Sequence, residues 1–270
     1  MKLHARPFHV VFAWMKANQI AGDFMDKSLW GPLMEIYHRL YPKGDFSMPA
    51  MVVGGVAFRD QMYLARANVG YGTFAIDPLK CIDITREELE FIFKNRPDQG
   101  WRAFYAVCDI WDFGYSVDDV VRSGTSAKDL LVNARASLSA TPRILTGNLD
   151  IDSSVQTACL TAELSIKGAV KHLGATDQEL KGLSHRLPKL AEALIAQEPR
   201  PTDRRFAVAA SKFPDYVGTR YGNHGLTRIQ LMDLAMRAQF VAAEAVRRIS
   251  DRNLAGEMEA RNETPTRGDL

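Results

Sequence analysis

The sequence predicts an α+β protein with a small amino-terminal α+β domain over residues 1–122, a carboxy-terminal all-α helical bundle over residues 123–250, and a flexible tail over residues 251–270. Three observations support this prediction. Residues 51–76 are rich in Val, Phe, Tyr and Gly, as strands and their turns are. In the second domain apolar residues recur at three- and four-residue steps, the period of a helix with one buried stripe. The last twenty residues are polar and uncapped, which is typical of a frayed terminus.

Two helices are expected near the start of the first domain. Residues 10–22 are apolar and fit either a helix or a strand, and of the two we favour the helix. Residues 27–40 place leucine, isoleucine and tyrosine side chains on one side of a second helix. Further on, Thr85-Arg86-Glu87-Glu88 fits a capping box that opens a short helix, which Pro97 ends.

Roughly three strands are expected in the same domain. Residues 51–58 and 62–76 form two of them, joined by a hairpin at Arg59-Asp60-Gln61. The alternation in residues 102–111 predicts the third. Gly54-Gly55 lacks the strand–loop–helix context of a phosphate loop, and a bulge or close strand packing is the simpler interpretation.

No cofactor and no metal site is predicted. Asp109, Asp112, Asp118 and Asp119 match no cation-loop spacing, and we interpret them as the polar exit from a strand. The histidines and cysteines show neither a C-x-x-C motif nor the paired spacing of a zinc site.

Start and stop signals bound each helix of the second domain. The expected ranges are 127–145, 151–173, 177–196, 204–213 and 228–249. Pro142 must kink or end the first helix, and Gly174 closes the second. Thr176 and Thr227 begin capping boxes, and Pro188 marks a new start within the third range. Short connections between these helices predict an antiparallel bundle.

The last helix carries a long apolar stripe. Its members are Leu231, Leu234, Ala235, Ala238, Val241, Ala242, Ala245 and Ile249. The stripe is wide enough for both a core and a partner helix, so we predict a homodimer.

Composition and charge bound the function. The chain has 270 residues, of which 46% are hydrophobic and 24% charged, as in globular proteins. A net charge of +2 is too small to argue by itself for a nucleic-acid or membrane partner. Three widely spaced cysteines suit a reducing compartment, and no stretch could span a bilayer. We therefore expect a cytoplasmic protein with no membrane partner.

Four residues form the candidate ligand-binding set: Glu163, Lys167, His185 and Tyr221. Glu163 and Lys167 stand four apart with the glutamate first, so they either line a polar cleft or form an ordinary helical pair. His185 lies among cationic residues and either helps to bind an anion or fixes a helix end by a hydrogen bond.

A basic patch is the second candidate. Its residues are Arg204, Arg205, Lys212, Arg220 and Arg228, with Tyr216 and Tyr221 among them. The tyrosines could stack on a base. A solvated basic face is the alternative.

Several sequence elements of the second domain occur in the order typical of one family. They are Ala162-Glu163 with Lys167, Ser184-His185-Arg186-Leu187, Phe213-Pro214-Asp215-Tyr216, Arg220-Tyr221 and the alanine-rich last helix. Together they resemble the HEPN (higher eukaryotes and prokaryotes nucleotide-binding) domain over about Ala127–Ile249. The resemblance implies an up-and-down helical bundle that commonly dimerises. Members are metal-independent endoribonucleases or forms that bind nucleotides or other small ligands, many of them in toxin–antitoxin or defence systems.

The resemblance also implies two catalytic candidates, Arg220 and His224. Ribonuclease members use an arginine followed, after four to six residues, by a histidine. The histidine acts as general base on a ribose 2′-hydroxyl, and the arginine steadies the phosphate. Here three residues separate the pair, and Gly222 predicts a loop. The alternative is that Arg220 packs this loop and His224 is an ordinary loop histidine.

Three functions follow. The first is a HEPN protein that binds a nucleotide or RNA in a polar, basic cleft of a dimeric bundle, with an antitoxin or other protein as a further candidate partner. The second is a metal-independent endoribonuclease that uses Arg220 and His224. The third is a non-catalytic structural interaction protein.

Overall fold

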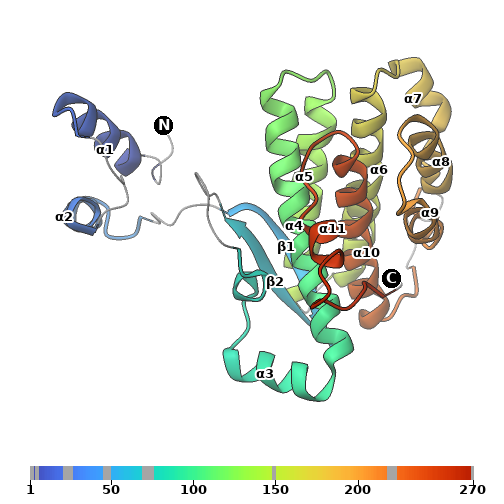
Figure 1. Cartoon of the computed structure of the whole chain (residues 1–270), viewed down its shortest axis with the longest axis horizontal. Helices are drawn as coiled ribbons and strands as arrows, with labels where there is room; N and C mark the ends of the chain where they lie inside the picture. The colour runs from blue at the N-terminus through green and yellow to red at the C-terminus, as the bar shows by residue number, and fades with distance from the viewer. Residues whose placement is uncertain are drawn as a thin grey trace. The chain divides into compact units, whose positions relative to one another are not determined.

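The structure, a computed structural model, describes Leu3 and residues 6–20, 27–44, 50–68, 76–147, 150–217 and 224–268. It confirms the α+β class, since a two-stranded sheet precedes a helical bundle (Figure 1). The chain divides into two compact units, Met1–Ala50 and Met51–Leu270. The predicted boundary at residue 122 differs from this division because the helix that ends there packs against the bundle's last long helix.

The first unit contains two helices, α1 (Arg6–Ala17) and α2 (Lys27–Leu40). The second lies where the sequence predicts it, and the first begins four residues earlier than predicted. The rings of Phe8 and Trp30 lie 4.6 Å apart, so aromatic packing joins the two helices.

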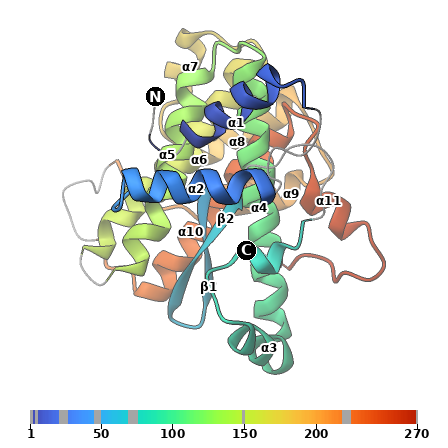
Figure 2. The ribbon, with the colours of Figure 1, turned by 90° about the vertical axis from the view of Figure 1, so that its left-hand side faces the viewer.

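The second unit begins with a hairpin of β1 (Ala50–Phe58) and β2 (Gln61–Asn68). Strand β2 packs against α4 (Pro97–Arg122) and α5 (Lys128–Thr146) (Figure 2). The hairpin prediction is confirmed. Of the predicted second strand, residues 69–75 lie outside the described residues.

The remaining elements of this unit follow in chain order. They are η2 (Pro78–Cys81), α3 (Arg86–Asn95), α4, α5, η3 (Ile151–Ser153), α6 (Ser154–His172), α7 (Asp177–Leu183), α8 (Leu187–Gln197), α9 (Asp203–Ser211), α10 (Arg228–Arg247) and α11 (Leu254–Glu259). All three predicted capping boxes form, at Thr85, Thr176 and Thr227. Gly174 has a φ of +107°, as the residue that closes a helix requires. The predicted bundle helices are confirmed with two differences: residues 184–186 divide the range 177–196 into α7 and α8, close to the new start predicted at Pro188, and α5 continues through Pro142 to Thr146.

The predicted strand over residues 102–111 is wrong, because these residues lie in α4. Almost every side of α4 is buried, from Ala103 to Val120. A helix covered all round has no polar face, so its sequence lacks the 3.6-residue stripe that identifies a surface helix. Asp109 and Asp112 are therefore interior helical residues, and their interpretation as a strand exit is also wrong.

Helix α10 lies at the centre of the bundle and packs against α4, α5, α6 and α9. Its Gln239 amide clamps β1: Nε2 donates to the carbonyl oxygen of Gly55 at 2.8 Å, and the Gly55 amide donates to Oε1. A Cβ added to Gly54 would lie 2.3 Å from Ile110 Cδ1. Close packing therefore requires glycine here, as the sequence suggests.

The apolar stripe of α10 is used within the chain. The stripe residues from Leu231 to Ala245 are all buried in the bundle. This burial removes the argument that the same stripe also receives a partner helix, and homodimerisation stays a prediction. Among the described residues, no helix combines the length and apolarity that crossing a membrane requires.

The predicted flexible tail is wrong for most of its length. Residues Leu254–Glu259 form α11, which packs against α4. The Tyr105 hydroxyl donates to the carbonyl oxygen of Pro265 at 2.6 Å. Arg267 is only 7% exposed and binds the Asp109 carboxylate with both terminal nitrogens. Long-range ion pairing thus fixes a segment whose local sequence is polar.

Candidate functional site

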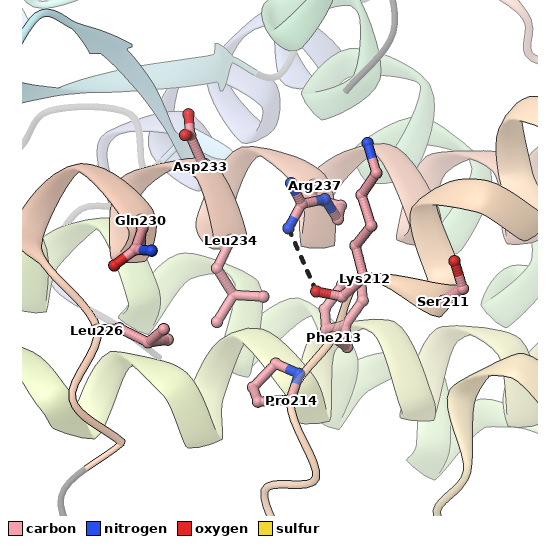
Figure 3. A pocket seen from close by; sticks show the side chains of 9 residues that line it. All are labelled: Ser211, Lys212, Phe213, Pro214, Leu226, Gln230, Asp233, Leu234 and Arg237. Carbon is pink, nitrogen blue, oxygen red and sulfur yellow. Dashed lines mark hydrogen bonds between the residues drawn. The ribbon is translucent and has the colours of Figure 1, made fainter.

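A pocket of about 440 Å³ lies between α10 and the segment that follows α9. Its lining residues are Ser211, Lys212, Phe213, Pro214, Leu226, Gln230, Asp233, Leu234 and Arg237. Figure 3 shows the cationic side chains of Lys212 and Arg237 near one another, with Leu226 and Pro214 on the other side of the space. This volume falls in the range of small-molecule sites, which combine apolar walls with a few polar groups.

Local sequence signals shape this pocket. Helix α9 ends at Ser211, and Pro214 cannot continue a helix because it lacks an amide hydrogen. On the other side, the capping box of Thr227 and Gln230 starts α10. The chain between the two helices therefore leaves the bundle, and the first turns of α10 form the pocket wall.

Arg237 is the distinctive residue of the pocket. Its Nη1 donates to the carbonyl oxygen of Lys212 across a long 3.5 Å, and its buried Nε has no hydrogen-bond partner among the described residues. Burial lowers the pKa of Arg237 below the ordinary arginine value, with Asp233 acting in the opposite direction and Arg102 in the same one. The guanidinium is thus a partly desolvated cation whose hydrogen-bonding capacity is only partly used.

The pocket's carboxylate is shared between Arg237 and a second arginine. Asp233 Oδ1 accepts a hydrogen bond from Nη2 of Arg102 at 2.6 Å, so it is already paired. Lys212 brings a second cation to the same wall. The pocket can therefore hold an anionic group beside an apolar body.

Three of the four predicted ligand-binding residues meet in a second place. The Glu163 carboxylate is 2% exposed, and its Oε1 accepts from Lys167 Nζ at 2.8 Å. His185 Nδ1 lies 2.9 and 3.0 Å from the two oxygens of this carboxylate. Tyr216, 5% exposed, donates its hydroxyl to Oε2. We call these four residues the Glu163 cluster.

The Glu163 cluster joins α6 to two loops. His185 lies between α7 and α8, and Tyr216 lies in the segment after α9, where Phe213 and Pro214 line the pocket. The (i, i+4) spacing of Glu163 and Lys167 predicts their contact. Tyr216 belongs to the predicted basic patch, and no local signal connects it with Glu163, 53 residues away.

The predicted basic patch does not assemble as one surface from its described members. Arg205 pairs with Glu259 of α11, and Arg228 donates to the main-chain oxygens of Asp60 and Leu145. These arginines hold segments of the bundle together. Lys212 instead lines the pocket.

The catalytic candidates are only partly described. His224 is half-buried, two residues before the pocket-lining Leu226. Arg220 and Tyr221 lie outside the described residues. The pairing of Arg220 with His224 and the ligand role of Tyr221 therefore stay predictions.

A third polar group, which the sequence interpretation missed, is buried between α4 and α10. Arg247 donates to Asp109, Asp112 and Glu244 at 2.6 to 2.8 Å, and Arg267 also binds Asp109. Each of these five side chains is at most 7% exposed. We call them the Asp109 network. The (i, i+3) spacings of Asp109 with Asp112 and of Glu244 with Arg247 are the signals that could have indicated it.

Comparison with known proteins gives no relative. No protein-family model, no curated protein and no solved structure matches this chain. The resemblance to the HEPN family accordingly stays a prediction from the sequence.

Proposed function

We propose that this protein is a HEPN-like binding module that holds a nucleotide, free or within RNA, in the pocket beside α10. The phosphate would lie against Arg237 and Lys212, and the base against the apolar wall. The observation that carries the proposal is the half-buried Arg237, whose Nε has no partner among the described residues. A phosphate in the pocket would add a charge-assisted hydrogen bond to the guanidinium and offset its desolvation.

Titration calorimetry tests the proposal. Native protein is titrated with adenosine monophosphate in one arm and with a short RNA oligonucleotide in the other, so that free nucleotide and RNA are distinguished. Arg237→Gln is expected to weaken binding by about tenfold or more, because a hydrogen bond to a charged group contributes about 1.5 to 3 kcal/mol.

Arg143→Gln is the matched control. Arg143 is an exposed arginine of α5 that lies outside the pocket wall, so this variant removes the same charge. Its affinity should stay within about twofold of the native value. The proposal would be contradicted if Arg237→Gln bound the ligands as tightly as the native protein does. It would also be contradicted if the native protein bound neither ligand.

A metal-independent endoribonuclease is the second candidate. His224 favours it, because this histidine stands two residues before the pocket-lining Leu226 and an imidazole can serve as a general base. RNA cleavage in EDTA by the native protein, abolished by His224→Ala and by Arg220→Ala with folding intact, is the expected result. Cleavage unaffected by either substitution would remove these residues from the mechanism.

The setting of this function is part of the proposal. A homodimer, an antitoxin or other partner protein, and a cytoplasmic location agree with the family resemblance and with three free cysteines. Sedimentation of the native protein at micromolar concentration tests the dimer. If nucleotides and RNA fail to bind and the protein still self-associates, a structural interaction protein becomes the better description.

A further inference from the structure

His185 has one ring nitrogen held by a carboxylate and the other uncommitted. Ionised Glu163 can only accept hydrogen bonds, so His185 Nδ1 must carry the hydrogen that they share. In the neutral ring the lone pair then resides on Nε2. Within the described chain Nε2 makes no hydrogen bond, and 53% of the side chain is exposed. The ring is thus fixed in the tautomer that leaves a nucleophilic nitrogen accessible.

The backbone beside His185 is strained. Ser184 has φ +61° and ψ −147°, a conformation that is nearly confined to glycine. It lies between the end of α7 and the start of α8, and it turns the chain so that His185 meets the carboxylate on α6. Strain of this kind persists where the surrounding contacts fix a geometry, and it concentrates at functional sites.

The surroundings of His185 are cationic. Lys181, Arg186 and Lys189 are all exposed and stand within four residues of it. Lys167 donates to Oε1 of the same Glu163 carboxylate. Exposed cations around a nucleophile attract an anionic reactant and stabilise its phosphate oxygens.

We propose that His185 accepts a phosphoryl group on Nε2 from a phosphoanhydride or a phosphoramidate. The Nε2 lone pair attacks phosphorus, the Nε2–P bond forms, and the bond from phosphorus to the leaving group breaks. With phosphoramidate the leaving group departs as ammonia. The Nδ1 hydrogen stays in its bond to Glu163, whose charge stabilises the positive charge that develops on the ring. This proposal is independent of nucleotide binding in the pocket.

The chain contains its own control for this reaction. His9 in α1 is also exposed, but it has no hydrogen-bond partner among the described residues. Both histidines can be followed in one sample. The ratio of their modification rates therefore cancels differences in reagent and protein concentration.

The experiment incubates the full chain with potassium phosphoramidate at neutral pH and maps phosphohistidine by mass spectrometry. We expect His185 to react about tenfold faster than His9. His185→Gln should remove the fast modification. Glu163→Gln should bring the two rates within about twofold, because the ring loses the adjacent negative charge.

Tyr216→Phe is the matched variant, since it removes one hydrogen bond to Glu163 and leaves the carboxylate beside His185. It should retain the fast modification, and thermal unfolding checks that each variant is folded. Equal rates at His185 and His9 in the native protein would overturn the proposal. An unchanged rate ratio in folded Glu163→Gln would overturn the positioning role of Glu163.

Discussion

The Glu163 cluster and the Asp109 network start from the same physical problem. Each contains a carboxylate side chain that is at most 3% exposed. Such burial is costly unless cationic or hydrogen-bonding partners bind the carboxylate. Asp109 forms ion pairs with two arginines whose side chains are at most 5% exposed. Glu163 accepts hydrogen bonds from a buried tyrosine, from a lysine whose side chain is 14% exposed, and from a histidine whose side chain is 53% exposed.

This difference separates a structural group from a reactive one. In the Asp109 network both carboxylate and guanidinium groups are enclosed, so a ligand has no donor to reach. In the Glu163 cluster the buried carboxylate acts through a partner that faces solvent. A buried charge thus fixes helix packing in one place and orients an exposed imidazole in the other.

Removing Asp109 should produce the largest effect. Asp109→Ala leaves the Arg247 and Arg267 guanidiniums buried with fewer partners, and we expect a loss of about 3 to 5 kcal/mol in the free energy of unfolding. Urea denaturation measures it. Asp98→Ala is the matched control on the same helix, because Asp98 pairs with Arg96 at the surface, and its midpoint should not shift measurably. A loss well below 3 kcal/mol in Asp109→Ala would show that the Asp109 network is not shielded from water.

The same residue predicts a pH dependence. Burial opposes ionisation of Asp109, but the guanidiniums of Arg267 and Arg247 outweigh it and lower the pKa below the ordinary value of 3.8. The resulting stabilisation is fully present above that ordinary value and is lost as the pH falls through the lower folded-state pKa. Urea midpoints measured from pH 6 downward should therefore fall less steeply in Asp109→Ala than in the native protein.

Removing Arg267 should have the next largest effect. Arg267→Ala deletes one partner of Asp109 but leaves Arg247, so we expect a loss of about 2 to 3 kcal/mol. The matched control is Arg261→Ala, an exposed arginine of the same carboxy-terminal segment. Urea denaturation is measured for both variants. If the carboxy-terminal segment were frayed, neither substitution would change the free energy of unfolding.

Local signals account for the parts of the fold that the sequence predicts. The capping boxes at Thr85, Thr176 and Thr227 begin helices wherever they occur, since the bonds that define them join residues three apart. The Glu163–Lys167 contact is predicted for the same reason. Helix α4 is missed because burial on all sides erases its periodicity.

Contacts between distant residues account for most of the rest. Arg267 and Asp109 are 158 residues apart, and nothing in the polar tail indicates that one of its arginines enters the bundle. Tyr216 contacts Glu163 from the segment that follows α9, and α9 itself packs against α8. Arg237 lies on α10 within a segment that reads as an amphipathic helix, and the pocket beside it depends on the path of the preceding loop.

Neutralising Glu163 should cost less than removing Asp109. In Glu163→Gln the amide oxygen can still accept hydrogen bonds, and Lys167 can turn its ammonium toward water, so we expect a loss of about 1 to 2 kcal/mol in the free energy of unfolding. Thermal and urea unfolding measure it, with Glu192→Gln on the exposed side of α8 as control. A loss as large as that of Asp109→Ala would mean that the Glu163 cluster is shielded from water as fully as the Asp109 network.

The smallest expected effect has the opposite sign. Ser184→Gly places at φ +61° the residue that adopts this conformation without strain, so it should raise the free energy of unfolding by about 1 kcal/mol. The control is Ser137→Gly within α5, which should lower it by about 0.5 kcal/mol because glycine weakens a helix. Urea denaturation of the two variants compares the effect of glycine on the free energy of unfolding at a strained position and at an ordinary helical one. A loss of stability in Ser184→Gly would mean that the Ser184 backbone is not strained, and the orientation of His185 would then rest on Glu163 alone.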